Sequence, residues 1–96
     1  MSDTAETSTT PRIVATANVL GGDPRIEGTR VGVHGIYRRY AKLNDEPSAI
    51  AADYDLSLAE VHAALAYAFA NTEEMRAIER RTAELREEGG TITPKG

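Results

Sequence analysis

The sequence predicts a small, mainly α-helical domain with a short β element near its N-terminal end. From Val33 onward, large apolar residues recur at intervals of three and four, which is the spacing of one face of a helix. Before Val33, short β-branched runs surround a Gly-Gly-Asp-Pro turn at residues 21–24. A chain of 96 residues has room for one hydrophobic core. We therefore expect one folded domain with tails.

The predicted core is thin. Hydrophobic residues make up 41% of the chain, but fifteen of them are alanines, which bury little apolar surface. A domain of this size gains stability when a second chain covers part of its surface. We therefore expect a homodimer or a complex with another protein.

The composition excludes several classes of site. Without cysteine the chain has no disulfide, no thiolate nucleophile and no cysteine-ligated zinc site. Its two histidines, His34 and His62, are too few to form a structural zinc site on their own. The glycine pair at 21–22 lacks the Gly-Lys-Ser/Thr ending of a P-loop, and no serine belongs to a suitable His-Asp arrangement. We predict a protein that is not an enzyme and that has no catalytic residue, metal or cofactor.

The first ten residues lack the basic start and the apolar run of a secretory signal, and no stretch approaches the length of a transmembrane helix. We therefore expect a cytoplasmic protein that does not contact a membrane. Their Ser, Thr and acidic composition predicts disorder. The predicted organisation is a disordered tail at 1–11, a β element with a helical domain at 12–71, a charged C-terminal helix at 72–90 and a loose tail at 91–96.

The predicted β element has three short pieces. Residues 12–15 are a strand candidate that precedes the turn at 21–24. Arg25-Ile26 and Arg30-Val31 then flank residues 27–29, which predicts a tight loop or a small hairpin. These pieces are too short to form a sheet alone, so they must pack on the helices.

The first predicted helix has an apolar side and a basic side. Its apolar side consists of Val33, Ile36, Tyr37, Tyr40 and Leu43. On the other side, His34, Arg38 and Lys42 are spaced by four residues, with Arg39 adjacent. This spacing predicts a cationic stripe along the solvent face.

Two more helices follow after short connections. Pro47 suits the first position of a helix, whose inner face would be Ile50, Ala51 and Tyr54. Ser57 and Glu60 have the spacing of a capping box, which predicts that another helix begins there. This third helix is expected to end near Asn71. Its predicted buried residues are Leu58, Val61, Leu65, Ala68 and Phe69.

The order of these helices is that of a tri-helical helix-turn-helix unit, whose last helix often enters the DNA major groove. The early outward positions of the third helix offer no Arg, Lys, Asn or Gln, so direct reading of bases is weakly supported. Basic residues of the first half could instead contact phosphates, or they could be an ordinary solvated face. The candidate DNA-binding residues are Arg30, Arg38, Arg39, Lys42, Ser57 and His62.

The fourth predicted helix is highly charged and stops at the Gly89-Gly90 pair. Its glutamates and arginines are interleaved at spacings that favour surface ion pairs, so they do not form an active site. A narrow apolar stripe of Met75, Ile78 and Leu85 suits docking on a partner, although packing within the chain is the simpler alternative.

Charge differs between the two halves of the chain. Residues 11–44 contain six basic and two acidic residues, whereas residues 45–88 contain four basic and eleven acidic residues. The formal net charge of the whole chain is -4, which argues against indiscriminate binding of polyanions. This charge asymmetry suits a protein with separate faces for two partners. The alternative is a chance distribution of charged surface residues in a short chain.

Residues 21–33 read Gly-Gly-Asp-Pro-Arg-Ile-Glu-Gly-Thr-Arg-Val-Gly-Val, which resembles the signature of domain-of-unknown-function family 433. The resemblance continues through Pro47 and the 53–58 segment to residues 61–67. It implies a homeodomain-like or winged-helix-like bundle with a small N-terminal β element, often dimeric. It also implies a gene beside that of a toxin with a PIN-like ribonuclease fold, so that members are regarded as probable antitoxins.

The sequence departs from the family pattern near the second helix. Asp45-Glu46 and Asp55 stand where many members have a glycine and a proline, and their negative charge opposes close contact with DNA. Within the signature, Arg30 either binds a ligand or pairs internally with an acid such as Asp53.

Two functional hypotheses follow. In the first, the protein is the antitoxin of a type II toxin-antitoxin system: the 57–71 helix binds DNA for transcriptional autoregulation, and the C-terminal helix binds a PIN-like toxin. In the second, it is a protein-protein interaction module that neutralises a partner without binding DNA.

Overall fold

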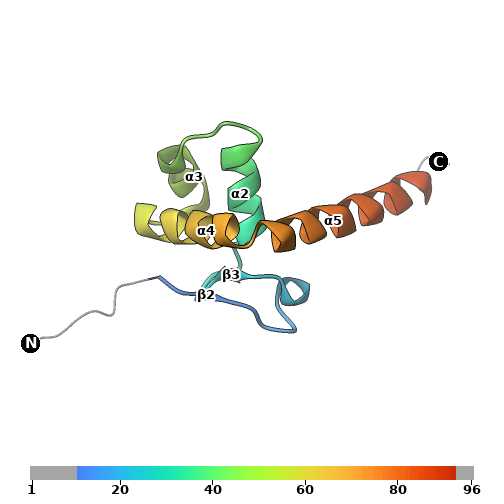
Figure 1. Cartoon of the computed structure of the whole chain (residues 1–96), viewed down its shortest axis with the longest axis horizontal. Helices are drawn as coiled ribbons and strands as arrows, with labels where there is room; N and C mark the ends of the chain where they lie inside the picture. The colour runs from blue at the N-terminus through green and yellow to red at the C-terminus, as the bar shows by residue number, and fades with distance from the viewer. Residues whose placement is uncertain (1–10, 93–96) are drawn as a thin grey trace, which may run out of the picture.

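The computed structural model describes residues 11–92, with side chains up to Arg86. It confirms the predicted fold class, a mainly helical domain with a small N-terminal β element (Figure 1). The predicted N-terminal tail apart from Pro11, and the last four residues of the predicted C-terminal tail, lie outside the described residues.

The β element is a two-stranded antiparallel sheet. Strand β2 (Ile13–Val14) pairs with β3 (Arg25–Ile26), and Ile13 lies opposite Ile26. Between them the chain turns through a short 3-10 segment, η1 (Leu20–Gly22). Gly21 and Gly22 have φ values of 63° and 91° there, which glycine adopts without strain. The Ile26 side chain is fully buried and attaches the sheet to the helices.

The predicted second part of the hairpin is reduced to a tight loop. An isolated bridge joins Arg25 to Gly32, and the Ile26 amide donates to the carbonyl of Val31 at 3.1 Å. The Thr29 hydroxyl donates to the Ile26 carbonyl and accepts from the Val31 amide, while Arg25 donates to the Thr29 carbonyl. These bonds fix the loop that leads into the first helix.

Three helices form the body of the domain, in the predicted order. Helices α2 (Val33–Ala41) and α3 (Pro47–Tyr54) both pack against α4 (Leu58–Ala70). Six side chains of these helices are completely buried, and these are Val33, Ile36, Ile50, Val61, Ala64 and Ala68. The apolar periodicity therefore identified the centre of the core correctly.

The start of α4 confirms the predicted capping box. The Ser57 hydroxyl oxygen accepts from the Glu60 amide at 3.1 Å, and the Glu60 carboxylate accepts from the Ser57 amide at 2.9 Å. Asp55, with φ of 60°, ends α3 in the left-handed region and reverses the chain just before this cap. Leu56 packs against the core between the two helices.

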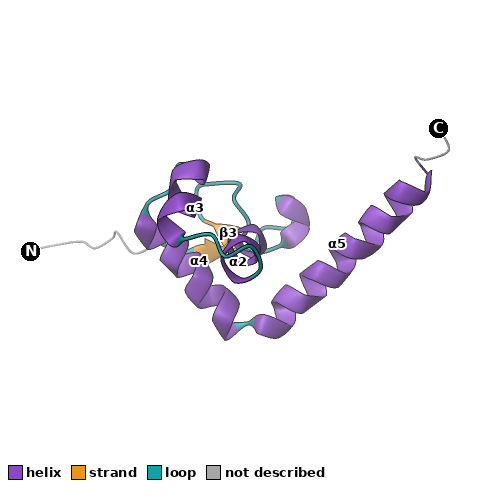
Figure 2. Ribbon diagram, turned by 90° about the horizontal axis from the view of Figure 1, so that it is seen from above, coloured by secondary structure: helices purple, strands orange, loops and turns teal. Residues whose placement is uncertain are grey.

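The last helix, α5 (Thr72–Ile92), makes a sharp corner with α4 and then leaves the bundle (Figure 2). At the corner the Tyr67 hydroxyl donates to the Glu74 carboxylate at 2.7 Å, and the Asn71 side chain donates to the Tyr67 carbonyl. Met75 and Ile78 are buried in the core, with exposed fractions of 1% and 4%. All side chains at residues 80–86 are exposed.

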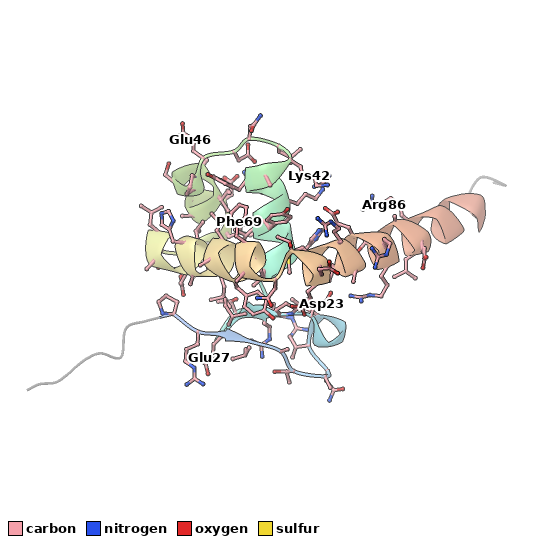
Figure 3. All side chains as sticks on the ribbon, viewed as in Figure 1. Asp23, Glu27, Lys42, Glu46, Phe69 and Arg86 are labelled. Atoms are coloured by element: carbon pink, nitrogen blue, oxygen red, sulfur yellow. The ribbon has the colours of Figure 1, made fainter. Side chains whose placement is uncertain are left out.

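One contact holds α5 to the β element. The Arg81 guanidinium lies 2.6 Å from the Asp23 carboxylate, and Figure 3 shows Asp23 beneath the first turns of α5. Beyond Arg81 the helix has no ion pair within the described residues. The corner, the two buried residues and this ion pair therefore set the direction in which α5 projects.

The predicted stop at Gly89-Gly90 is wrong, because α5 continues to Ile92. Each glycine lowers helix stability by about 1 kcal/mol relative to alanine without forbidding the conformation. The first residue that blocks a helix sterically is Pro94, which lies outside the described residues.

Several residues predicted to be buried are exposed. Phe69 has an exposed fraction of 52% and lies on the surface where α4 meets α2 (Figure 3). It packs edge-to-face on Tyr37 and Tyr40, with ring centroids 5.6 and 6.1 Å away. The other exposed members of the predicted inner faces are Tyr40, Leu43, Tyr54 and Leu58. Within residues 11–92 no element covers the ends of these short helices, so periodicity overestimates their burial.

We predict that Met75→Ala lowers the free energy of unfolding by about 2–5 kcal/mol, because it removes a fully buried side chain and leaves a cavity between α5 and the bundle. Urea denaturation followed by circular dichroism measures this change. The matched control is Leu85→Ala on the same helix, which should change the free energy by less than about 0.5 kcal/mol. Equal effects of the two substitutions would show that Met75 does not anchor α5.

Candidate functional site

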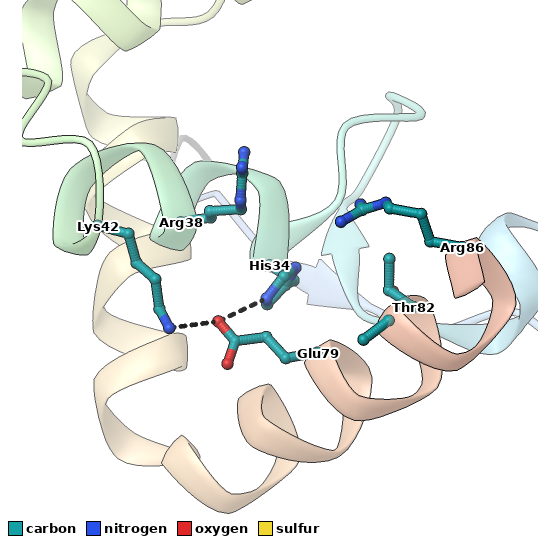
Figure 4. Close-up of a pocket in the computed structure, with 7 residues that line it drawn as sticks. His34, Arg38, Lys42, Glu79, Thr82 and Arg86 are labelled. Carbon is teal, nitrogen blue, oxygen red and sulfur yellow. Dashed lines mark ion pairs between the residues drawn. The ribbon is translucent and has the colours of Figure 1, made fainter. Parts of the chain in front are cut away.

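An open groove of about 400 Å³ lies between α2 and α5 (Figure 4). We call it the α2–α5 groove. Its lining residues are His34 and Arg38 of α2, Lys42 at the C-cap of α2, and Glu79, Thr82, Ala83 and Arg86 of α5. His34, Arg38 and Lys42 therefore lie along one side, as the predicted basic stripe required, and this side borders α5 while Arg38 and Lys42 stay exposed to solvent.

Glu79 links the two walls of the α2–α5 groove. Its Oε2 lies 3.1 Å from Lys42 Nζ and 3.4 Å from His34 Nε2. Burial alone would raise the pKa of Glu79, but the hydrogen bonds and charges of Lys42 and His34 together outweigh burial and hold this pKa below its ordinary value. Glu79 is therefore a fixed negative charge at the base of the groove at neutral pH.

Arg38 and Arg86 bring positive charge to the open side of the groove. Figure 4 shows the Arg86 guanidinium reaching from α5 toward α2. Neither arginine is within 4.0 Å of a carboxylate among the described side chains. With Lys42, the groove contains three permanent cations against the single carboxylate of Glu79. Its net charge is positive although the whole chain is acidic.

Arg39 has a structural role. It donates to Asp45 and Asp53, each at 2.8 Å, and its guanidinium lies 5.7 Å from the centre of the Tyr54 ring. The hydrogen bonds to Asp45 and then Asp53 raise the pKa of Arg39 further above its already high value. Arg39 thus ties α2 to α3 and to the loop between them, and its contact with phosphate stays a prediction.

The suggested pairing of Arg30 with Asp53 is wrong, because Asp53 pairs with Arg39. Arg30 is exposed in the loop before α2 and does not line the α2–α5 groove. Of the four basic candidates for phosphate contact, the structure brings two together, Arg38 and Lys42. The sequence placed His34 in the basic stripe but not among the phosphate candidates, and it did not select Glu79 or Arg86, because only the path of α5 places residues 79–86 opposite α2.

The outer face of α4 offers little to a DNA base. The Ser57 hydroxyl is used in the helix cap, and His62 is exposed beside small residues. The exposed residues of this helix are Leu58, Ala59, His62, Ala66, Phe69 and Ala70. Base-edge recognition usually relies on Arg, Lys, Asn or Gln, none of which occurs in α4. The Ser57 and His62 candidates therefore do not form a base-reading surface together.

The three residues of the predicted partner-binding stripe are in different environments. Met75 and Ile78 are buried in the core of this chain, as the alternative of internal packing expected, so a partner cannot reach them. Leu85 belongs to the same row but lies beyond the bundle, where its exposed fraction is 64%. Within the predicted stripe, Leu85 alone is accessible to another protein.

A second hollow of about 370 Å³ lies beside the exposed aromatic pair Tyr40 and Phe69. Asp45, Glu46 and Pro47 form its other side. This hollow escaped prediction because both aromatic residues were expected to face the core.

The part of the chain that the structure describes contains no group of three or more His, Asp or Glu side chains placed to hold a metal ion. Within the same part, the helices are too short or too polar to cross a bilayer.

The sequence model of a family of proteins of unknown function, DUF433, matches residues 13–68. The chain belongs to the DUF433 family. No curated protein and no solved structure matches it. The matched region of this DUF433 protein includes the α2 wall of the α2–α5 groove, whereas α5 lies beyond it.

We predict that Lys42→Met raises the pKa of Glu79, because it removes the first of the two hydrogen bonds that lower it. A carboxyl with a lowered pKa stabilises the fold above its ordinary pKa, and this contribution is lost as the pH falls through the folded-state value. The stability lost on acidification should therefore be smaller in Lys42→Met. Titration of the Glu79 carboxyl carbon by NMR measures the pKa directly.

The matched control for this titration is Lys42→Arg, which keeps a cation on α2 and should keep the pKa of Glu79 low. An identical titration of Glu79 in the wild type and in Lys42→Met would contradict the bridge between α2 and α5.

Proposed function

We propose that this DUF433 protein is an antitoxin-type interaction module that binds a partner protein through the projecting part of α5. The observation that carries the proposal is the exposure of Leu85 on a helix segment that has left its own bundle (Figures 1 and 2). The folded body, residues 13–78, then serves as the scaffold that holds this segment.

The projecting segment is poorly stabilised by the rest of the chain. Short helices are marginal in water unless an apolar face is buried. Residues 80–86 are all exposed, and Leu85 continues the row in which Met75 and Ile78 are already buried. A groove on a partner would extend that burial by one more large residue. This is the helix-in-groove mode of recognition, in which residues on one helical face act as anchors.

The partner suggested by the family resemblance is a PIN-like ribonuclease toxin. Residues 72–92 contain six glutamates and four arginines, so the whole helix is acidic. A ribonuclease binds a polyanion and therefore tends to be basic around its substrate site, and complementary charge favours its association with an acidic helix. The mixed charge of α5 adds further ion-pairing positions around Leu85.

The autorepressor version of the antitoxin hypothesis has weaker support. It requires α4 to read DNA bases, but α4 exposes no long hydrogen-bond donor. It also relied on Arg39, which is committed to Asp45 and Asp53. We therefore favour a module that neutralises its partner by binding it, with sequence-specific DNA binding as the competing hypothesis.

We predict that Leu85→Asp weakens binding to the PIN-like protein encoded beside this chain's gene by at least about tenfold, because burying a leucine contributes about 1.5–3 kcal/mol. Calorimetric titration of the two purified proteins measures the affinity. Leu43→Asp is the matched control, since Leu43 is the same residue type and is also exposed but lies in the turn after α2. Unchanged affinity in Leu85→Asp, or an equal loss in Leu43→Asp, would contradict the proposal.

A further inference from the structure

The α2–α5 groove contains more positive charge than its own carboxylate can balance. Lys42 is paired with Glu79, but Arg38 and Arg86 line the same groove without a carboxylate partner among the described residues. Like charges held on facing walls repel one another, and an anion between them removes that repulsion. We infer that the α2–α5 groove binds a phosphate group of a nucleic-acid backbone, without regard to base sequence.

The side chains of the groove match the chemistry of a phosphate. A guanidinium presents a planar set of donors that can bind two phosphate oxygens at once. Two guanidinium groups and the Lys42 ammonium provide donors from both walls, and Thr82 also lines the groove. Nε2 of His34 is buried and lies 3.4 Å from the Glu79 carboxylate, so it interacts with Glu79 and not with the phosphate. The His34 ring lines the groove and therefore reports on a ligand that binds there.

Glu79 limits how strongly the groove attracts anions. Its carboxylate occupies the inner end, where it holds Lys42 and His34. A phosphate is therefore placed toward the outer end, between Arg38 and Arg86, where Figure 4 shows both head groups. Substitution of Glu79 by glutamine keeps the shape of the side chain and removes the competing charge. Phosphate binding should consequently become tighter in Glu79→Gln.

The shape of the groove favours a phosphate that belongs to a polymer. Sites for small ligands are concave and bury most of the ligand surface. The α2–α5 groove is open along one side, so a free phosphate would stay largely hydrated there, whereas a nucleic-acid strand brings neighbouring phosphates to the exposed ends of Arg38 and Lys42. Since α4 offers no base-reading donors, the interaction should not depend on sequence.

The test is fluorescence anisotropy of a short labelled duplex of arbitrary sequence, measured over a salt series. The full-length protein should bind this duplex. It should bind DNA from upstream of its own gene with no higher affinity. Three neutralised phosphates predict a log-log salt slope of about 2.7. Arg38→Ala/Arg86→Ala should weaken binding at least about tenfold and lower the slope by about 2.

The matched control is Arg76→Ala/Arg80→Ala. It removes the same two charges at exposed positions of α5 that do not line the groove. This control should retain binding within about twofold and should lower the slope by less than about 0.5. Equal losses in the two double variants would mean that general charge attracts the duplex, and would overturn the groove as its site. Circular dichroism of both variants verifies that the helices are intact.

An NMR titration distinguishes the source of the phosphate. The duplex should shift the His34 ring signals at micromolar concentration, and inorganic phosphate should do so only at far higher concentration. A stronger response to inorganic phosphate than to the duplex would overturn the nucleic-acid assignment, and unmoved His34 signals with both probes would overturn the site. Leu85→Ala removes the apolar contact of the proposed function without adding a charge beside Arg86. It should bind the duplex as the wild type does, so the two proposals fail separately.

Discussion

The burial of Met75 and Ile78 is the constraint on which the rest of this structure depends. These two side chains fasten the start of α5 to the bundle, and the corner formed by Tyr67, Asn71 and Glu74 sets its direction. Three features of the molecule depend on the direction of α5. It places Glu79 against α2, it opens the groove between the two helices, and it carries the rest of α5 away from the core (Figure 2).

One helix therefore contributes to three environments in succession. Its first two turns complete the hydrophobic core, its middle supplies a charged wall opposite α2, and its exposed part presents Leu85. Leu85 and Arg86 are adjacent in sequence but point to different surroundings, since Arg86 lines the groove and Leu85 does not. Leu85 can therefore contact a protein while Arg86, on the same short segment, contacts a phosphate.

Signals between neighbouring residues predicted the helices well. Contacts between helices could not be predicted from such local signals. The capping box at Ser57 and the proline at the start of α3 are decided by neighbouring residues, so they were visible in the sequence. The partners of Arg39, the exposure of Phe69 and the meeting of Glu79 with Lys42 depend on the angles at which helices cross. Periodicity states that a helix has an apolar side, but it does not state how much of that side a neighbour covers.

The central claim is that residues 80–92 form a projecting helix that becomes buried when the partner binds. Hydrogen exchange of the backbone amides, with and without the proposed PIN-like partner, tests this claim most directly. The account predicts rapid exchange of residues 80–92 in the free protein, slow exchange of the core residues of α4, and strong protection of residues 80–92 in the complex. Unchanged exchange of this segment in a complex that demonstrably forms would contradict it.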